Sequence, residues 1–259
     1  MIREICTHDR TSSMILNDTR DFHCGSAKVM DYLEKFDRTG VCLVNGEGTM
    51  HHNRPLSIDL MQKLRLSLQN GSETMLVNTV WDSMDMDDDM VDTLKNSYVS
   101  TREIKSWKEL QKWGIDSDIH LDCSYWSEVE YKKMSYSSLR VGDIYGRPSD
   151  HLEYEHRINI HDMTWDDLVN TLRHTEFFVT GRHHEMYASC VAQCPFFVID
   201  GNTHKNTGLI EWSGAEIPCV PDQFLKFNKL DYYIDMCRER LDEYNKLWDF
   251  MDSQPRLVV

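Results

Sequence analysis

The chain has 259 residues, of which 41% are hydrophobic and 10% aromatic, and this composition excludes an intrinsically disordered chain. Its length fits one large domain or two small ones, and its formal net charge of −15 repels polyanions, so a contact with nucleic acid would need a local basic groove. No stretch approaches the roughly 18 apolar residues of a membrane span, and MIREICTHDR lacks the apolar core of a signal peptide, so we expect a cytoplasmic protein.

Short apolar strands alternate with helical patterns along the first half of the chain, which is typical of an α/β protein with mostly parallel sheets. A strand is predicted at 14–17, a helix at about 25–36 and a second strand at 41–45. Pro55 stands at the first position of a helix that ends at Asn70-Gly71, with an apolar stripe of Leu56, Leu60, Met61, Leu64 and Leu68. Strands at 74–80, 98–101 and 120–123 follow, and Ser106 opens a helix with a capping box.

The second half begins after a polar stretch at 127–138. Strands are predicted near 139–144 and 156–160, and Thr164 with Asp167 opens a helix. A strand at 177–180, a helix at 185–193 and a strand at 196–200 form one βαβ unit, and one long helix is predicted over 230–250. We therefore expect an N-terminal lobe at 1–126, a C-terminal lobe at 127–229 and a C-terminal helical segment at 230–259.

Polar clusters follow four predicted strands, at 17–25, 45–52, 180–184 and 200–205. Parallel sheets bind ligands at the carboxyl ends of their strands, where helix N-termini present unpaired N–H groups. Each cluster also has a plain interpretation. The stretch NGEGT fits a tight turn and lacks the third glycine of a dinucleotide fingerprint, histidines 51 and 52 fit a solvated loop, and Arg182 fits a surface ion pair.

The third and fourth clusters close consecutive strands, so we expect Arg182 with His183 to lie beside His204 with Lys205. Arginine offers a bidentate fork, lysine a point charge and the following helix its first amides. This combination fits a diphosphate group.

The sequence favours no metal site. The acidic run from Asp82 to Asp92 fits a solvated helix start, and no HxxxH or HExxH spacing is present, although His51, His52, His183 and His184 leave weak room for zinc. The eight cysteines include no CxxC pair and are expected to be reduced, mostly buried thiols.

Five segments in order resemble the motif series of polysaccharide pyruvyl transferase-like proteins. They are ILNDTRDFHCGSAKVM, VCLVNGEGTMHH, YVSTREIKSWKELQKWGI…LDCS, FFVTGRHHEMYASCVAQCPFFVI and GNTHKNTGL, and they extend from about residue 14 to about residue 214. That family is similar to GT-B glycosyltransferases, so the resemblance implies two Rossmann-like lobes that face each other across a cleft. Its members transfer pyruvate from phosphoenolpyruvate, or a sugar from an activated donor, to a hydroxyl group.

The resemblance also implies site residues, with the acceptor on the first lobe and the donor on the second. The first-lobe cleft would contain His23, Gly25, Asn45, Gly46, Glu47, Gly48, Thr49, Arg102, Glu103 and Ser106. The donor would be bound by Arg182, His183, Asn202, Thr203, His204 and Lys205, of which Arg182, His204 and Lys205 would stabilise the leaving phosphate. The candidates for the general base are Glu47, His23 and His51. His184 and Glu185 depart from the family pattern, and the short loops leave the acceptor site open.

The function that this resemblance favours is a metal-independent GT-B transfer of sugar from a nucleotide-sugar donor, without a cofactor. The acceptor would be a hydroxyl of a glycan or of a hydroxymethylated base in DNA, because small members of this kind are met in bacteriophages. Two alternatives stay open: pyruvyl ketal transfer from phosphoenolpyruvate to a polysaccharide, and a non-catalytic module that binds a nucleotide or DNA. A nucleotide sugar would need a base and ribose site, predicted near Asp143, Tyr145 and Glu211. A basic strip for DNA, which equally fits a scattered solvated surface, would consist of Lys105, Lys108, Lys112, Lys132, Lys133, Arg140 and Arg147.

Overall fold

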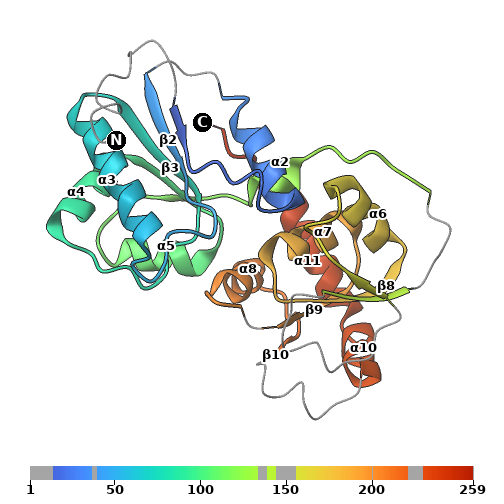
Figure 1. The fold of residues 1–259 in the computed structure, drawn as a ribbon. Helices are drawn as coiled ribbons and strands as arrows, with labels where there is room; N and C mark the ends of the chain where they lie inside the picture. Colours follow the sequence, from blue (N-terminus) through green and yellow to red (C-terminus); the bar gives the residue numbers. More distant parts are fainter. Residues whose placement is uncertain are drawn as a thin grey trace. The chain divides into compact units, whose positions relative to one another are not determined.

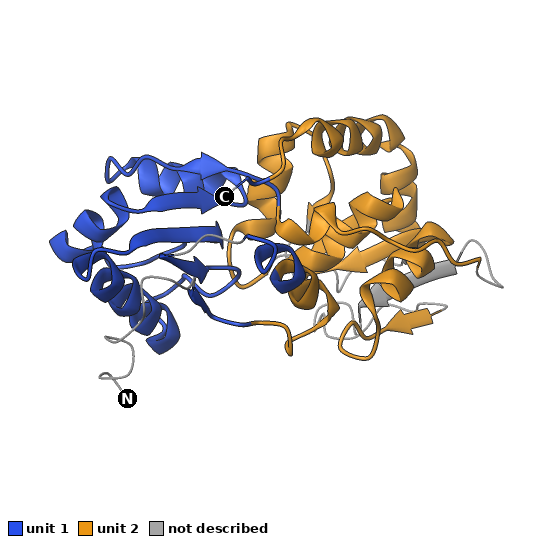
Figure 2. Ribbon diagram, turned by 90° about the horizontal axis from the view of Figure 1, so that it is seen from above, with its two compact units in different colours: residues 1–18, 30–121, 257–259 blue, residues 19–29, 122–256 orange. Residues whose placement is uncertain are grey.

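The computed structural model describes residues 14–36, 40–133, 139–143, 156–199, 201–220 and 230–258 (Figure 1). The chain divides into two compact units (Figure 2): unit 1 contains residues 1–18, 30–121 and 257–259, and unit 2 contains residues 19–29 and 122–256. The sequence places the main boundary at 126/127, whereas this division falls at 121/122, because the segment that begins at Asp122 packs against a helix of unit 2.

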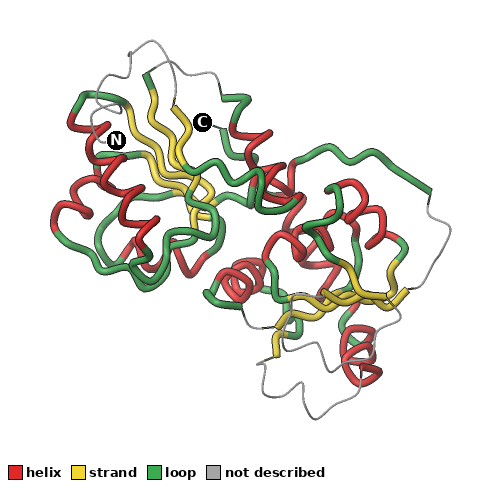
Figure 3. The backbone as a smooth tube through the Cα atoms, in the orientation of Figure 1, coloured by secondary structure: helices red, strands yellow, loops and turns green. Residues whose placement is uncertain are grey.

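Unit 1 contains a five-stranded parallel sheet whose spatial order, β1-β2-β3-β4-β5, is also the chain order. The strands are β1 (Met14–Leu16), β2 (Val41–Asn45), β3 (Glu73–Thr79), β4 (Tyr98–Thr101) and β5 (Asp118–Ile119). Because crossovers between parallel strands are right-handed, a sequential order brings the connecting helices to one face of the sheet. These helices are α3 (Pro55–Gln69), α4 (Asp88–Lys95) and α5 (Ile104–Gln111), which gather beside the strands in Figure 3.

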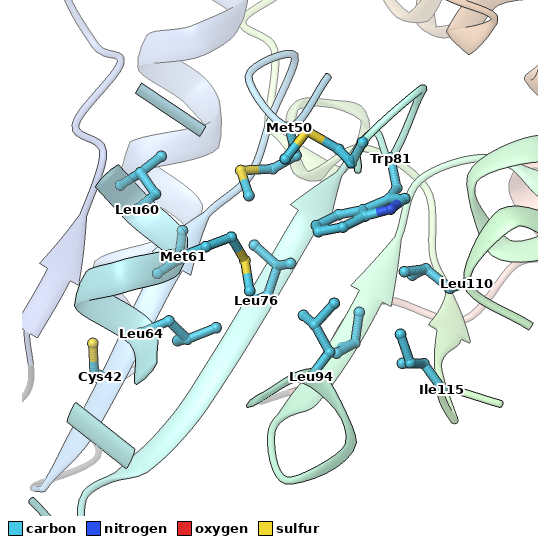
Figure 4. Packing of buried hydrophobic residues seen from close by; sticks show 13 residues of the cluster. Cys42, Met50, Leu60, Met61, Leu64, Leu76, Trp81, Leu94, Leu110 and Ile115 are labelled. Atoms are coloured by element: carbon cyan, nitrogen blue, oxygen red, sulfur yellow. The ribbon is translucent and has the colours of Figure 1, made fainter. Parts of the chain in front are cut away.

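The core of unit 1 lies between this sheet and its helices. Leu60, Met61 and Leu64 of α3 pack on Leu76 of β3 and on Trp81 (Figure 4). Pro55 is the first residue of α3, which confirms the predicted start of the helix. The predicted apolar stripe is wrong at Leu56, which is 45% exposed. Serines at 57 and 67 take the remaining buried positions of α3.

Unit 2 contains a second five-stranded parallel sheet, in the order β10-β9-β8-β6-β7. Its strands are β6 (Leu139–Asp143), β7 (His156–Ile158), β8 (Thr175–Thr180), β9 (Phe196–Ile199) and β10 (Cys219–Val220), and its helices between strands are α6 (Trp165–Arg173), α7 (His183–Ala192) and α8 (Lys205–Ser213). The chain runs outward from β6 to β7, then returns to pair β8 with the opposite side of β6. The strand order therefore reverses between β6 and β8, as at the ligand-binding switch points of doubly wound sheets.

The predicted α/β class with parallel sheets is confirmed, but some local predictions are wrong. The strand predicted at 120–123 is replaced by the short β5 and the 3-10 helix η1 (Cys123–Trp126), because the Asp122 carboxylate accepts from the Ser124 amide at 2.9 Å. Glu103, not Ser106, caps α5 by accepting from the amides of Lys105 and Ser106. The capping pair Thr164 and Asp167 of α6 is present as predicted.

The single helix predicted over 230–250 is two helices, α10 (Leu230–Arg238) and α11 (Leu241–Ser253). The break is at Arg240, whose φ of −116° leaves the helical region and whose amide bonds to the carbonyl of Cys237, three residues back, instead of four. Neither glycine nor proline marks it in the sequence. Both helices still pack on β9, since Cys237 and Tyr244 donate to the carbonyl of Phe196.

The sequence also predicts that no segment spans a membrane and that the cysteines are reduced thiols. Among the described residues, no helix has both the length and the apolar character that crossing a membrane requires. The seven cysteines in this part of the chain are free thiols, as predicted, and Cys6 lies outside it.

Candidate functional site

The loops that follow β8 and β9 lie side by side at the carboxyl edge of the unit 2 sheet. The two strands are neighbours, and Asn206 on the first turn of α8 donates from Nδ2 to the carbonyl of Gly181 at 3.0 Å. Asn206 Oδ1 also lies 3.3 Å from Nδ1 of His183, the first residue of α7. The predicted juxtaposition of the two loops is therefore confirmed, and its bridging residue, Asn206, was missed because a buried amide has no sequence signature.

The positively charged side chains at this edge, Arg182 and Lys205, each contact a neighbouring polar side chain. Arg182, at the N-cap of α7, keeps 30% of its side chain exposed, and its Nε lies 4.0 Å from Glu185 Oε1. Glu185 is fully buried and accepts from the hydroxyl of Thr180. Lys205 Nζ donates to Asn202 Oδ1 at 3.2 Å. Arg182, Lys205 and the N-terminal amides of α7 and α8 all lie at this edge, and groups of these kinds favour an anion.

The remaining donor-side residues belong to the same loop. His204 is the N-cap of α8, and Thr203 precedes it; both are half-buried, whereas Asn202 is exposed. An anion at this edge would therefore meet the exposed side chains of the loop before the buried ones.

The adjacent histidines 183 and 184 are both buried and face different partners. His183 contacts the ring of Tyr187 at 4.9 Å as well as Asn206. Nε2 of His184 lies 3.3 Å from Oδ2 of Asp122, which is fully buried. The sequence offers no role for His184, because its carboxylate partner is 62 positions away along the chain. Only the fold brings them together.

His23 lies in unit 2 and contacts the same cluster. Its ring is 4.7 Å from that of His184 and 5.8 Å from that of His161, and its Nδ1 accepts from the Ser26 amide at 3.3 Å, close to the start of α2 (Cys24–Leu33). Burial, then the charges of His184, Arg182 and His161, lower the pKa of His23 from 6.5 to about 2, against the opposing effect of Asp122.

Two properties of His23 therefore count against its predicted role as general base. Its low pKa makes it a poor proton acceptor. Its Nδ1 already accepts a hydrogen bond, which leaves Nε2 to carry the proton of the neutral ring. This arrangement favours His23 as a hydrogen-bond donor.

The other predicted bases lie in unit 1. Glu47 is 7% exposed and follows β2 with a φ of 32°, and its carbonyl accepts from the Val80 amide at 2.9 Å. His51 is buried, with its Nδ1 2.8 Å from Nδ1 of His52. One of these two nitrogens must donate and the other accept, so the pair is neutral at this contact or carries a single positive charge.

The remaining predicted residues of unit 1 lie at the carboxyl edge of its sheet. Asn45 ends β2 and is fully buried, and its carbonyl accepts from Asn17 Nδ2 at 2.7 Å. The same Asn17 nitrogen lies 3.2 Å from the hydroxyl of Thr49. A Cβ on Gly46 would lie 2.3 Å from Oγ1 of Thr79, at the end of β3, so this glycine is required for packing. Gly48 lies in the turn that follows.

Arg102 and Ser106 belong to the next loop of that edge. Arg102 follows β4, is 1% exposed, and its amide donates to the carbonyl of Thr79 at 3.1 Å. The Ser106 hydroxyl accepts from the Trp81 amide at 2.7 Å and donates to Glu103. These contacts tie the loops after β3 and β4 together.

Several predicted residues do not join either edge. Glu211 is exposed in the last turn of α8, at the end opposite to the carboxyl edge, which disfavours it as a ribose ligand. Tyr145, Arg147 and the side chains of Asp143 and Arg140 lie outside the described residues. The basic strip is divided between the units, and Lys112 and Lys132 pair with Glu109 and Asp167, so a scattered surface is the better interpretation.

The acidic run forms the start of α4, as predicted. Asp87 caps the helix by accepting from the Met90 amide, and Asp89 pairs with Arg65 at 2.6 Å. Asp85, Asp87 and Asp89 line a pocket of about 330 Å³ in unit 1, together with Arg65 and the apolar side chains of Ile58, Met61 and Met90.

Comparison with known proteins identifies the fold but no function. No family model matches the chain, and no curated protein matches it. Its fold is similar to the crystal structure of a functionally uncharacterized protein from Klebsiella pneumoniae, with a TM-score of 0.59 and 10% sequence identity. The match covers 85% of this chain and 95% of the Klebsiella chain.

Proposed function

We propose that this chain is a GT-B-type glycosyltransferase that binds the diphosphate of a nucleotide-sugar donor at the carboxyl edge of unit 2. The observation that carries the proposal is the position of Arg182 and Lys205 at the starts of α7 and α8, next to the β6/β8 reversal of strand order. Positive side chains, helix N-termini and a topological switch point together are the usual setting for a phosphate group.

The transfer chemistry follows from the charges at this edge. When the bond between the sugar and the diphosphate breaks, negative charge develops on the leaving phosphate oxygens. Arg182, Lys205 and the first amides of the two helices would stabilise this charge in place of water. In the proposed GT-B arrangement, unit 1 supplies the acceptor side, with its carboxyl edge of Asn45, Glu47 and Arg102. The acceptor would be a hydroxyl of a glycan or of a hydroxymethylated base in DNA.

Calorimetry with UDP, GDP, CDP, CMP and phosphoenolpyruvate tests the donor. We expect one nucleoside diphosphate to bind, and Arg182→Ala to weaken its binding about 10- to 100-fold, because a charge-assisted hydrogen bond contributes about 1.5 to 3 kcal/mol. Arg238→Ala is the matched control, since Arg238 is an exposed arginine of the same unit that pairs with Glu176. Binding of phosphoenolpyruvate alone would replace the proposal with pyruvyl transfer, and binding of none of these compounds would overturn both.

Incubation with hydroxymethylcytosine-containing DNA or a glycan and a panel of nucleotide sugars tests the acceptor. A mass gain of one hexose on the nucleoside or glycan would name donor and acceptor together. A donor that binds but gives no mass gain on any acceptor would indicate a non-catalytic nucleotide-binding module.

A further inference from the structure

The peptide group that leads into α7 is held at both of its polar atoms. This group joins Gly181 to Arg182, the N-cap residue of α7. Its carbonyl oxygen accepts from Nδ2 of Asn206 at 3.0 Å, and its N–H donates to Oγ1 of Thr180 at 2.8 Å. Because a peptide group is planar, the two hydrogen bonds together fix the orientation of the whole group. They therefore also fix the direction in which the chain enters Arg182.

The glycine in this peptide group makes the two hydrogen bonds important. Gly181 has no Cβ atom, so rotation of the peptide group meets less steric resistance than beside any other residue. The bond from Thr180 lies within the loop after β8, whereas the bond from Asn206 comes from α8, 25 positions further along the chain. Asn206 therefore sets the position of the peptide group relative to the neighbouring loop.

The side-chain amide of Asn206 is buried, and its partners define which way it points. The residue is 1% exposed. The Gly181 carbonyl can only accept, so the atom that faces it is the donor Nδ2, and Oδ1 faces Nδ1 of His183 at 3.3 Å. A reversed amide would place two acceptor oxygens against each other at Gly181. Both ends of this amide are therefore used, and each has one role.

The same side chain links the two segments that carry the cations of this edge. Asn206 follows Lys205 in the first turn of α8, and the peptide group that it holds directly precedes Arg182. A Cβ atom on Gly201 would lie 3.4 Å from the carbonyl oxygen of Gly181, so the loop after β9 passes close to this hydrogen bond. One buried amide therefore connects the turn of Lys205 with the peptide group that leads to Arg182.

We propose that Asn206 is a positioning residue of the donor site, which acts through the Gly181–Arg182 peptide group to hold Arg182 in place for the diphosphate. The inference rests on the proposed function and deepens it. A site whose groups are in place before the ligand arrives loses less conformational entropy on binding, and its affinity is higher for that reason. The contribution of Arg182 to donor binding therefore depends on the amide of Asn206.

A double-mutant cycle in the full chain measures the coupling between Asn206 and Arg182. The probe is whichever of UDP, GDP and CDP binds the wild-type protein, and calorimetry gives its Kd at a temperature where melting curves show every variant folded. We expect Asn206→Ala alone to weaken binding about 5- to 50-fold. Arg182→Ala weakens it about 10- to 100-fold in the wild-type chain but should add less than about 3-fold in the Asn206→Ala chain, because Arg182 is no longer held there.

Asn170→Ala is the matched control for the loss of a buried amide. Asn170 is fully buried on α6 of unit 2 and donates to the carbonyls of Glu130 and Asp166, each at 2.7 Å. Its loss should lower the melting temperature but leave the Kd and the effect of Arg182→Ala unchanged. Asn206→Ala would behave in the same way if its role were merely structural. Additive effects of Asn206→Ala and Arg182→Ala would overturn the positioning role and leave the proposed function standing.

Histidine ¹⁵N NMR spectra of the wild-type protein test the orientation of the Asn206 amide without a ligand. We expect neutral His183 to carry its proton on Nδ1, because Oδ1 of Asn206 can only accept. A proton on Nε2 instead would mean that the amide is reversed and does not hold Gly181, which overturns the proposal. Wild-type protein that binds none of the three nucleoside diphosphates overturns the proposed function and with it the role of Asn206 in donor binding, whereas the tautomer of His183 still shows whether the amide holds the peptide group.

Discussion

A Cβ atom on Gly25 would lie 2.7 Å from Cβ of His184, so the first turn of α2 approaches α7 at a distance that only glycine allows. The imidazole of His184 occupies the space that a side chain at position 25 would fill. This contact, and the carboxylate of Asp122 on Nε2, hold His184 in one place. His184 is therefore in close contact with both Gly25 and Asp122 within unit 2.

Gly25→Ala should destabilise the protein. The added methyl group meets the Cβ and ring atoms of His184, and one of the two segments must move. We expect a loss of about 1 to 3 kcal/mol in the free energy of unfolding, as for other overpacked sites, partly offset by the higher helix propensity of alanine. Urea denaturation measures it. Gly181→Ala is the control, because a Cβ there would have its nearest neighbour at 3.6 Å; equal stability of the two variants would contradict the close approach.

The stability of the protein should fall on acidification because of His23. Its folded-state pKa of about 2 lies below the unfolded value of 6.5, so the unfolded state binds the proton more readily. The contribution is fully present above pH 6.5 and decreases as the pH falls from there toward 2. Between pH 7 and 5 the loss from this residue is about 1 to 2 kcal/mol.

His23→Asn separates this effect from helix capping. Asparagine can accept the hydrogen bond from the Ser26 amide but does not titrate, so the helix start is kept. We expect a flatter dependence of unfolding free energy on pH than in the wild type, by urea denaturation at pH 5, 6 and 7. Identical slopes in the two proteins would show that His23 is not the group responsible.

Asn206→Ala should lower the stability of the protein more than the same substitution at Asn202 on the same loop. Asn206 is 1% exposed and bonds to both the Gly181 carbonyl and His183, and its loss leaves the buried His183 and the half-buried Gly181 without that partner. The expected cost is about 1 to 3 kcal/mol of unfolding free energy. Asn202→Ala, at an exposed position on the same loop, should cost less than about 0.5 kcal/mol. Thermal melts of both variants compare them directly.

Asp87→Ala tests whether the acidic run stabilises a helix or binds a metal. Asp87 accepts from the amide of Met90 at 2.7 Å, and removing an N-cap costs about 1 kcal/mol. We expect this loss in unit 1, and no change in the wild-type melting temperature when millimolar Mg²⁺ or Ca²⁺ is added. A metal-dependent increase in the melting temperature that disappears in Asp87→Ala would favour a cation site.

The elements of this fold could be predicted because local patterns carry them. Tyr98–Thr101 has the predicted bounds, Pro55 begins α3, and Thr164 caps α6. The alternation of strands and helices also led to parallel sheets, and parallel sheets place their polar loops at one edge. For this reason the sequence alone could predict that the loops of Arg182 and Lys205 lie side by side.

Other features of the structure depend on contacts between segments that lie far apart in the sequence. The pairing of β6 with both β7 and β8, the break at Arg240, and the place of His23 within unit 2 have no local pattern that announces them. The partners of the two histidines are of the same kind: Asp122 and Asn206 lie 62 and 23 positions away along the chain, and both are buried. An imidazole takes its tautomer and its basicity from the atom that faces each nitrogen. The contacts of the two histidines in TGRHH therefore depended on which groups the folded chain placed beside their rings.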